Sequence, residues 1–495
     1  MLFNSLGFIV FFIISYLGYL ILPKKCRVGW LLAASYLFYM NWNATYALLL
    51  LGSTVITYIC ALMMAKYKKT ALIISLVMNF GILFAFKYLN FAIDSLSDVF
   101  HLFGNNALSE FELEILLPVG ISFYIFQAVG YTIDVYRKDV EPEKNFFRYA
   151  LFVSFFPQLV AGPIERSKRL LTQIQNIESI ESWNFDRIRS GFLVALYGYV
   201  MKMVIADRAA IYVDAIFDPK RYSQYAGFTL LIAMILFAVQ IYCDFAGYTY
   251  IAIGVARIFG FDLCKNFEQP YFARSVKEFW NRWHISLSTY FRDYLYFPLG
   301  GSRKGKFRKY LNLMIVFLVS GLWHGAAWHY VVWGLCHGVA RVLEEILSPV
   351  KSKIDAFLEK KGMANTKNFS FGLFEGVVTF VFVCVAWVFF RAESLSQAVD
   401  IIVAAFTEFN PWVLTDGTIL NLGIDAKGWN ILIVSIVFMV VIDILRYKKV
   451  ALTDWFLKQN IVFRWVTLLA AILFIVLAGV YGPAYDATSF IYFQF

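Results

Sequence analysis

The amino-acid sequence predicts an all-α protein that crosses a membrane many times. Of its 495 residues, 60% are hydrophobic and 19% aromatic, while only 16% are charged. Soluble domains carry roughly a quarter charged residues. Predominantly apolar segments recur, and counting the weaker ones we expect roughly 10–12 spans of about 20 residues each. Because backbone amides in lipid must be satisfied within the protein, we expect these spans to be helices.

The clearest apolar stretches are distributed along the whole chain. The first has no basic residue before it and no small-residue cleavage site after it, so we expect a span and not a cleaved signal peptide. The clearest stretches are Leu6–Leu22, Ala71–Leu89, Leu230–Ile241, Leu311–Leu322, Gly372–Phe390, Ile431–Leu445 and Val466–Val480.

Basic clusters between the apolar stretches predict the topology. Lys24, Lys25 and Arg27 directly follow the first stretch, and the positive-inside bias places them in the cytoplasm. A further cluster at 446–449 precedes the last stretch, which therefore runs outward until Gly482-Pro483 ends the helix. We expect both termini outside, which requires an even number of spans.

The charge and cysteine content exclude several classes of protein. The net charge of +10 is spread over loops, as expected from topology and attraction to anionic lipid headgroups, and it does not indicate nucleic-acid binding. The six cysteines have no paired spacing, so we expect buried small residues and not a disulfide framework.

Four of the five histidines fall within 54 residues, at His284, His324, His329 and His337. Titratable groups inside a membrane are costly and are functional candidates by default. The surrounding stretch from Glu278 to Arg303 is too charged for an ordinary span and too aromatic for a solvated loop. We expect short helices there, lying in or dipping into the membrane against other parts of the protein.

The residues from Val319 to Gly338 read as one apolar helical run interrupted by small residues that permit close helix packing. On a single helix, His324 and His329 would point about 140° apart. There is also no HExxH motif, so we expect no metal site. His329 and His337 fit interhelical hydrogen bonding, whereas His324 and His284 are candidate general bases for activating a hydroxyl.

The segment "GGSRKGK" at Gly300–Lys306 matches the glycine and lysine positions of a phosphate-binding loop. Phe307 stands where that motif needs Ser or Thr, and no strand precedes it. We therefore exclude nucleotide hydrolysis and expect a basic cytoplasmic loop. This loop has two possible partners: the phosphates of a donor such as coenzyme A, or the headgroups of membrane lipids.

Six blocks of this sequence, in order, carry a resemblance to the membrane-bound O-acyltransferase superfamily, in the bacterial branch of alginate and peptidoglycan O-acetyltransferase membrane subunits. Two of them read "FWNRWHISLSTYFRDYLYFPLGGSR" and "GLWHGAAWHYVVWGLCHG". The ending "FIYFQF" also resembles this branch. The other blocks are Leu117–Arg137, Phe155–Arg166, Gln240–Phe261 and Ala386–Ala398.

The resemblance implies a ring of helices and re-entrant segments around a central tunnel. It divides the chain into N-terminal helices at 1–115, a catalytic core at 116–398, C-terminal helices at 399–483 and an aromatic tail at 484–495. It also implies catalytic roles for His324 and His284. Tyr250 stands where the family pattern usually has an acidic residue, so this chain lacks that carboxylate. Further residues implied as donor-binding or tunnel-lining are Asn281, Trp283, Trp323 and Asp244.

The aromatic tail raises a specific hypothesis at Tyr492. In D-alanylating relatives a similar peptide belongs to a separate small partner and is proposed to carry the acyl group. The resemblance implies that Tyr492 accepts acetyl from a cytoplasmic thioester, acetyl-CoA or another, with His324 as base. An extracytoplasmic partner of the SGNH esterase type then passes the group to a polysaccharide. Tyr and Phe also anchor helix ends at membrane surfaces, which is the alternative reading of this tail.

The implied protein is a multi-pass acetyltransferase of the bacterial cytoplasmic membrane, with acetyl-CoA as a substrate and no bound cofactor. D-alanyl transfer of the teichoic-acid type is an alternative activity. A transporter or lipid-handling channel is the alternative of a different class. Transporters commonly contain paired repeats, and the sequence shows none.

Overall fold

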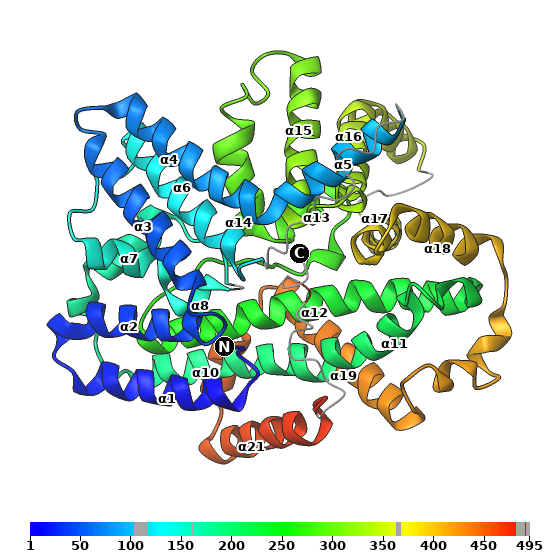
Figure 1. Cartoon of the computed structure of the whole chain (residues 1–495). Coiled ribbons are helices and arrows are strands. Elements are labelled where there is room, and N and C mark those ends of the chain that lie inside the picture. Colours follow the sequence, from blue (N-terminus) through cyan, green and yellow to red (C-terminus); the bar gives the residue numbers. More distant parts are fainter. Residues whose placement is uncertain (103–116, 161, 363–367, 482–490, 492–495) are drawn as a thin grey trace. The chain divides into compact units, whose positions relative to one another are not determined.

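The computed structural model describes residues 1–102, 117–160, 162–362, 368–481 and 491. Within these residues every regular element is a helix (Figure 1). The prediction of an all-α polytopic membrane protein is confirmed, because seven helices of the described residues are long and apolar enough to cross a membrane. They are Tyr46–Met63, Lys68–Phe100, Phe185–Phe217, Gly227–Phe259, Phe369–Arg391, Ala426–Tyr447 and Ile461–Ala478.

Two shorter apolar helices, α1 (Leu6–Ile21) and α18 (Leu395–Thr407), accompany these seven. Five of the expected apolar stretches fall mainly within the seven helices, and Leu6–Leu22 coincides with α1. Leu311–Leu322 lies in α15, which is not one of the seven. The expected total of 10–12 spans, the outside location of both termini and the four-part division of the chain stay predictions.

Contacts divide the chain into two compact units. The first contains Met1–Ala195, Tyr248–Cys264 and Ala487–Phe495. Its helices include α1, α2 (Arg27–Met40), α3 (Tyr46–Met63), α4 (Lys68–Leu83), α5 (Leu89–Leu102), α6 (Ile121–Arg137), α7 (Phe146–Ser154), α8 (Phe156–Leu159) and α9 (Ser167–Gln175).

Buried polar residues of the first unit pair with one another between helices. Ser53 Oγ donates to Asn79 Oδ1 at 2.5 Å, and Ser75 Oγ donates to Thr132 Oγ1 at 3.1 Å. The Arg27 side chain, 1% exposed, donates to the Ile180 carbonyl at 2.8 Å. These contacts satisfy groups that would otherwise be costly to bury.

The second unit contains Leu196–Gly247 and Lys265–Asp486. α10 (Phe185–Tyr199) and α12 (Gly227–Phe259) each contribute residues to both units. The remaining helices of the second unit include η4 (Val200–Ala206), α11 (Asp207–Phe217), α13 (Val276–Arg282), α14 (Ile285–Phe291), η7 (Arg292–Tyr296), α15 (Lys306–His324), α16 (Trp328–Lys360), α17 (Phe369–Arg391), α18, α19 (Ala426–Tyr447), α20 (Leu452–Leu457) and α21 (Ile461–Ala478).

Glycines bring α15 and α16 into close contact. A Cβ added at Gly321 would lie 2.3 Å from the carbonyl oxygen of Tyr330, and one at Gly334 would lie 2.4 Å from that of Phe317. Neither distance is sterically possible, so only glycine permits this approach. The expectation of close helix packing at these small residues is confirmed.

The prediction of one continuous helix from Val319 to Gly338 is wrong. α15 ends at His324, Gly325 and Ala327 are extended, and α16 begins at Trp328. Glycine is a poor helix former, and only glycine fits at this position, because a Cβ on Gly325 would lie 2.1 Å from the ring of Tyr330. His324 and His329 are therefore on different helices, and the angle of about 140° between them on one helix does not apply.

The expectation of short helices between Glu278 and Arg303 is confirmed. α13 and α14 have seven residues each, and the π-helical η7 follows directly. Ser275 caps α13 by accepting a hydrogen bond from the Glu278 amide at 3.1 Å, as N-cap serines do. The junction between α13 and α14 consists of Trp283 and His284.

Candidate functional site

His284 has an unusual backbone conformation at the junction of α13 and α14. Its φ of 41° lies in the left-handed region, which costs energy for a residue with a side chain. Such strain is found mainly at functional sites, where the surrounding structure maintains it. The His284 side chain is completely buried, so this strained residue is held inside the protein and not in a surface turn.

Asn266 determines which nitrogen of His284 carries the proton. His284 Nδ1 lies 3.0 Å from Asn266 Oδ1. The same oxygen accepts hydrogen bonds from the amide and hydroxyl of Ser286, at 3.3 and 2.8 Å. Because Asn266 Oδ1 acts as an acceptor, His284 Nδ1 donates to it and Nε2 holds the lone pair. Burial lowers the pKa of His284 to about 3, so its imidazole is neutral at cellular pH.

His324 is the last residue of α15 and is buried among aromatic rings. Its ring centroid lies 4.9 Å from that of Trp323, 5.0 Å from Trp333 and 5.3 Å from Phe390. Trp323 also lies 5.8 Å from the ring of His284. The two candidate catalytic histidines thus contact the same indole, and we call His284, His324, Trp323 and Asn266 the histidine centre.

The other predicted site residues occupy different surroundings. Trp283 is buried in an aromatic cluster, with its ring 5.0 Å from Phe267 and 5.1 Å from Trp387. Asp244 on α12 is 2% exposed and its carboxylate lies 2.6 Å from Lys202 Nζ, so it belongs to an ion-pair cluster. Tyr492 lies outside the described residues.

His329 and His337 make the interhelical hydrogen bonds expected of structural residues. His329 Nδ1 is 2.9 Å from the carbonyl oxygen of Phe389 on α17. His337 Nδ1 accepts a hydrogen bond from Trp280 Nε1 at 3.2 Å, which connects α16 to α13. This prediction is confirmed for both residues. Among the described residues, no group of three or more His, Cys, Asp and Glu side chains could hold a metal ion.

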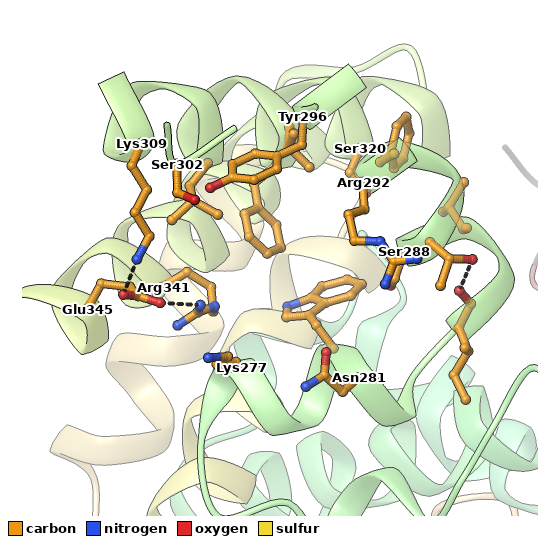
Figure 2. A pocket seen from close by; sticks show the side chains of 18 residues that line it. Lys277, Asn281, Ser288, Arg292, Tyr296, Ser302, Lys309, Ser320, Arg341 and Glu345 are labelled. Carbon is orange, nitrogen blue, oxygen red and sulfur yellow. Dashed lines mark hydrogen bonds and ion pairs between the residues drawn. The ribbon is translucent and has the colours of Figure 1, made fainter. Parts of the chain in front are cut away.

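A pocket of about 640 Å³ opens beside the histidine centre. Asn281 and Ile285, on either side of the 283–284 junction, contribute to its wall, as does Ser320, one turn before His324. Figure 2 shows Lys309, Glu345 and Arg341 on one side of the pocket, with Ser288 and Arg292 on the other. The remaining lining is largely apolar and includes Trp280, Leu287, Phe291, Leu313, Val316 and Phe317.

The cations of this pocket differ in how strongly they are already neutralised. Arg341 donates to Glu344 at 2.5 Å and to Glu345 at 3.2 Å, and Lys309 also pairs with Glu345. Lys277 on α13 and Arg292 on η7 also line the pocket, and Arg292 contacts the carboxylate of Asp293 at 2.9 Å. Because carboxylates compensate Lys309, Arg341 and Arg292, the side chain of Lys277 is the one best placed to attract an anionic ligand.

Glu344 fixes α13 onto α16. Its carboxylate accepts hydrogen bonds from the Val276 amide at 2.5 Å and from the Lys277 amide at 3.0 Å. These amides open α13, where the helix has no internal acceptors for them and the dipole favours a negative charge. The pocket wall and the segment leading to His284 are therefore fixed against the helix that follows His324.

Sequence reasoning did not identify Asn266 or Lys202. Asn266 is 18 positions before His284. It is a single polar residue in a stretch that mixes polar and apolar residues, so it does not stand out in the sequence. Lys202 was more visible, because a lysine within an apolar run of a membrane protein is costly unless it is paired. Its carboxylate partners, Asp207 and Asp244, could not be paired with it without the fold.

The described residues form an all-helical membrane protein with buried histidines beside a cationic pocket, an arrangement that fits an enzyme embedded in the membrane. The sequence pattern of the membrane-bound O-acyltransferase family matches residues 137–374. The chain belongs to this family, and it is a multi-pass membrane O-acyltransferase.

Its relatives place it in the bacterial O-acetyltransferase branch. It is 37% identical to the probable alginate O-acetylase AlgI of Pseudomonas putida, over 84% of this chain and 82% of that protein. It is 34% identical to the peptidoglycan O-acetyltransferase of Helicobacter pylori, over 81% of this chain and 79% of that protein. A teichoic acid D-alanyltransferase of Streptococcus thermophilus is 31% identical over 50% of this chain and 61% of its own length.

Proposed function

We propose that this protein takes an acetyl group from a cytoplasmic thioester, acetyl-CoA, and passes it across the bacterial inner membrane. The group then O-acetylates a cell-surface or exported polysaccharide. The named activities of the alginate and peptidoglycan relatives support the acetyl group and the polysaccharide. The observation that carries the proposal is that His284 and His324 contact one indole while their helices line a cationic pocket.

The pocket supports an acyl thioester that bears phosphates. Its volume of about 640 Å³ lies in the usual range for ligand sites, roughly 300–1,000 Å³. Its apolar lining suits a pantetheine arm, and Asn281 and Ser288 offer hydrogen bonds to the amides of that arm. Lys277 and Arg292 would contact phosphate oxygens, since both residue types bind phosphate.

In the proposed first transfer, His324 removes the proton from the Tyr492 hydroxyl as its oxygen attacks the thioester carbonyl carbon. A new C–O bond forms, the C–S bond breaks, and the thiolate leaves and takes up a proton. A phenol has an ordinary pKa near 10, so a nearby base is needed at neutral pH. The products are acetyl-tyrosine and free thiol.

The tautomer of His284 limits what this residue does. Because its Nδ1 donates to Asn266, Nε2 can only accept a hydrogen bond. We assign to His284 Nε2 the role of accepting a hydrogen bond from an N–H or O–H group of the acyl donor or the acyl acceptor. This hydrogen bond orients the substrate that makes it. Stabilisation of the carbonyl oxygen in the transition state must come from a different donor.

In the second transfer, a polysaccharide hydroxyl attacks the acetyl-tyrosine carbonyl with the help of an extracytoplasmic esterase-like partner. A C–O bond to the sugar forms, the bond to tyrosine breaks, and the phenol regains its proton. Both termini of the chain lie on the extracytoplasmic side in this scheme, which follows the arrangement of basic clusters.

The donor assignment is tested by comparing acetyl-CoA with acetyl-pantetheine, which lacks the phosphates. We expect a KM for acetyl-pantetheine at least tenfold higher, from the loss of about 1.4 kcal/mol or more of charge-assisted contacts. Lys277→Gln and Arg292→Gln should raise the KM for acetyl-CoA and leave that for acetyl-pantetheine unchanged. Lys353→Gln, at an exposed position of α16 outside the pocket lining, is the matched control. Equal KM values for both donors in the wild-type protein would contradict the assignment.

The carrier step is tested in cells with Tyr492→Phe, which removes one oxygen atom. The proposal predicts that ester on the surface polysaccharide disappears at a normal protein level. Full surface acetylation in this variant would contradict the carrier role of Tyr492. D-alanyl transfer is less favoured, because the D-alanyltransferase match covers only half of this chain, and surface D-alanine ester in place of acetyl would support it.

A further inference from the structure

The chain leaving α21 is held by four hydrogen bonds. The Val480 amide donates to the Met203 carbonyl of η4 at 3.1 Å, and Arg208 of α11 donates to the Ala478 carbonyl at 2.5 Å. Within the turn, the Gly479 amide and the Tyr481 hydroxyl both donate to the Ile475 carbonyl at 2.8 Å. The last residues of the α21 segment therefore have a defined attachment on η4 and α11.

The attachment is confined to the C-terminal end of α21. Only 11% of the residues in this 18-residue helix are buried, and the buried ones are Ile475 and Ala478. They pack into an apolar cluster with Val200, Met203 and Val204 of η4. The rest of this apolar helix is not covered by the described residues, as expected for a membrane span whose sides face lipid, and its fixed end is the one where the tail begins.

The turn after α21 is also sterically specific. A Cβ added at Gly479 would lie 2.6 Å from the Ile475 carbonyl oxygen and 2.6 Å from the Tyr481 hydroxyl oxygen. Both distances are too short for a real side chain. Glycine therefore permits the turn that directs the chain from the end of α21 towards η4.

η4 is in turn fixed to α12 by a buried ion pair. Lys202 Nζ lies 2.8 Å from Asp207 Oδ1 and 2.6 Å from Asp244 Oδ1, and each residue is at most 5% exposed. Gly247 lets the two helices approach, since a Cβ there would lie 2.9 Å from the Gly198 carbonyl oxygen. A π-helical turn such as η4 is rare and is frequently found at functional sites.

A short series of contacts connects this attachment to the histidine centre. Asp244, which pairs with Lys202, is followed on α12 by Phe245. The Phe245 ring meets the His284 ring edge to face, with centroids 4.7 Å apart. The position at which the tail begins is therefore fixed relative to His284 through η4 and α12.

We propose that Lys202, Met203, Arg208, Ala478 and Val480 form a tail anchor, whose role is to set the starting point of the C-terminal tail for acyl transfer at Tyr492. This inference rests on the proposed function. Arg208 is a positioning residue within it, because it touches the chain end and not the reacting groups. Tyr492 is twelve positions after Val480, and a chain of this length spans at most about 40 Å.

The physical benefit of the tail anchor is a high effective concentration of the phenol at the histidine centre. A short linker holds an attached group at an effective concentration in the millimolar range, but only when its origin lies within reach of the target. Loss of the Arg208 contact lets the origin move, so the attached tyrosine reacts more slowly. A tyrosine supplied on a separate peptide does not depend on that origin.

The test uses the full-length protein in lipid nanodiscs with acetyl-CoA. It measures the rate of acetylation of Tyr492 in the chain, and separately of a synthetic peptide SFIYFQF added to the Tyr492→Phe background. In Arg208→Met we expect the first rate to fall at least about tenfold, from loss of effective concentration. The peptide rate, the KM for acetyl-CoA and the melting temperature should stay close to those of the wild-type protein.

Arg464→Met is the matched control, because Arg464 donates to the Leu457 carbonyl at the opposite end of α21. It should leave both rates unchanged. Gly479→Ala perturbs the same turn without altering a charge and should reproduce the effect of Arg208→Met, which keeps the test valid if the arginine variant does not fold.

Three results would overturn the inference. Wild-type acetylation of Tyr492 in Arg208→Met would refute the tail anchor and leave the proposed function standing. An equal fall in the peptide rate would show a general structural role of Arg208. No acetyl group on Tyr492 in the wild-type protein would refute the carrier step itself, and the inference with it.

Discussion

The histidine centre and the ion-pair cluster of Lys202, Asp207 and Asp244 are both buried in the second unit. They differ in what offsets the free-energy cost of burying polar groups. Both histidine rings pack against aromatic side chains, and the tautomer of His284 places the lone pair on Nε2. The cluster buries one lysine between two carboxylates, at 2.6 and 2.8 Å. Imidazole rings of this kind can still exchange a proton with a substrate, whereas the charged groups of the cluster are occupied by their ion pairs.

We therefore assign the chemical step to the histidine centre and a structural role to the ion-pair cluster. Removing one member of a buried ion pair leaves an uncompensated charge, which is strongly destabilising. Removing an imidazole from an aromatic site changes packing modestly but eliminates proton transfer. Variants in the two regions should therefore differ in whether activity or folding is lost.

The largest effect is expected from His324→Gln. Loss of the general base should lower the rate of acetyl transfer by roughly 10²- to 10⁴-fold. The melting temperature should change little, because glutamine has a similar volume. The measurement is a single-turnover rate with labelled acetyl-CoA alongside thermal unfolding. Retention of transfer above a tenth of the wild-type rate would remove His324 from the role of base.

The next effect is expected from Lys202→Met, which leaves Asp207 and Asp244 buried together. It should destabilise the protein by about 3–5 kcal/mol, measured by chemical or thermal unfolding in nanodiscs. Lys309→Met is the comparison, since Lys309 pairs with Glu345 at 27% and 21% side-chain exposure. Screening there limits the loss to about 1 kcal/mol or less. Equal destabilisation by both variants would erase the distinction between the two regions.

The smallest effect is expected from Asn266→Ala, which removes the acceptor for His284 Nδ1. Loss of this buried hydrogen bond costs about 1–3 kcal/mol, which corresponds to a fall in transfer rate of roughly five- to 150-fold. Ser286→Ala removes a hydroxyl that donates to the same oxygen and lies 3.5 Å from His284 Nδ1, but it leaves the contact between Asn266 and His284 in place. A larger fall in transfer rate in Ser286→Ala than in Asn266→Ala would contradict the assigned tautomer of His284.

Much of the fold followed from the sequence because membrane segments obey simple rules. Apolar length predicted the helices, and the mixture of charged and aromatic residues at Glu278–Arg303 predicted short ones. The continuous helix through Gly325 was wrong, since hydropathy does not reveal where the backbone becomes extended, as it does at Gly325 and Ala327.

The candidate site was predictable only in part. His284 and His324 could be selected by type and position, but their shared contact with Trp323 depends on two separate helices meeting. The role of Asn266 needed the left-handed backbone at His284, which no local pattern predicts. Arg208 meets Ala478 across 270 positions of sequence, so the tail anchor was visible only in the structure.

The central claim is that acetyl passes through the phenol of Tyr492. Its most direct test is intact-mass and peptide analysis of the C-terminal fragment after incubation of the purified protein with acetyl-CoA. The account predicts one added acetyl group on Tyr492, labile to hydroxylamine and absent from His324→Gln. A fragment that remains unmodified while the same preparation transfers acetyl to an acceptor would contradict it.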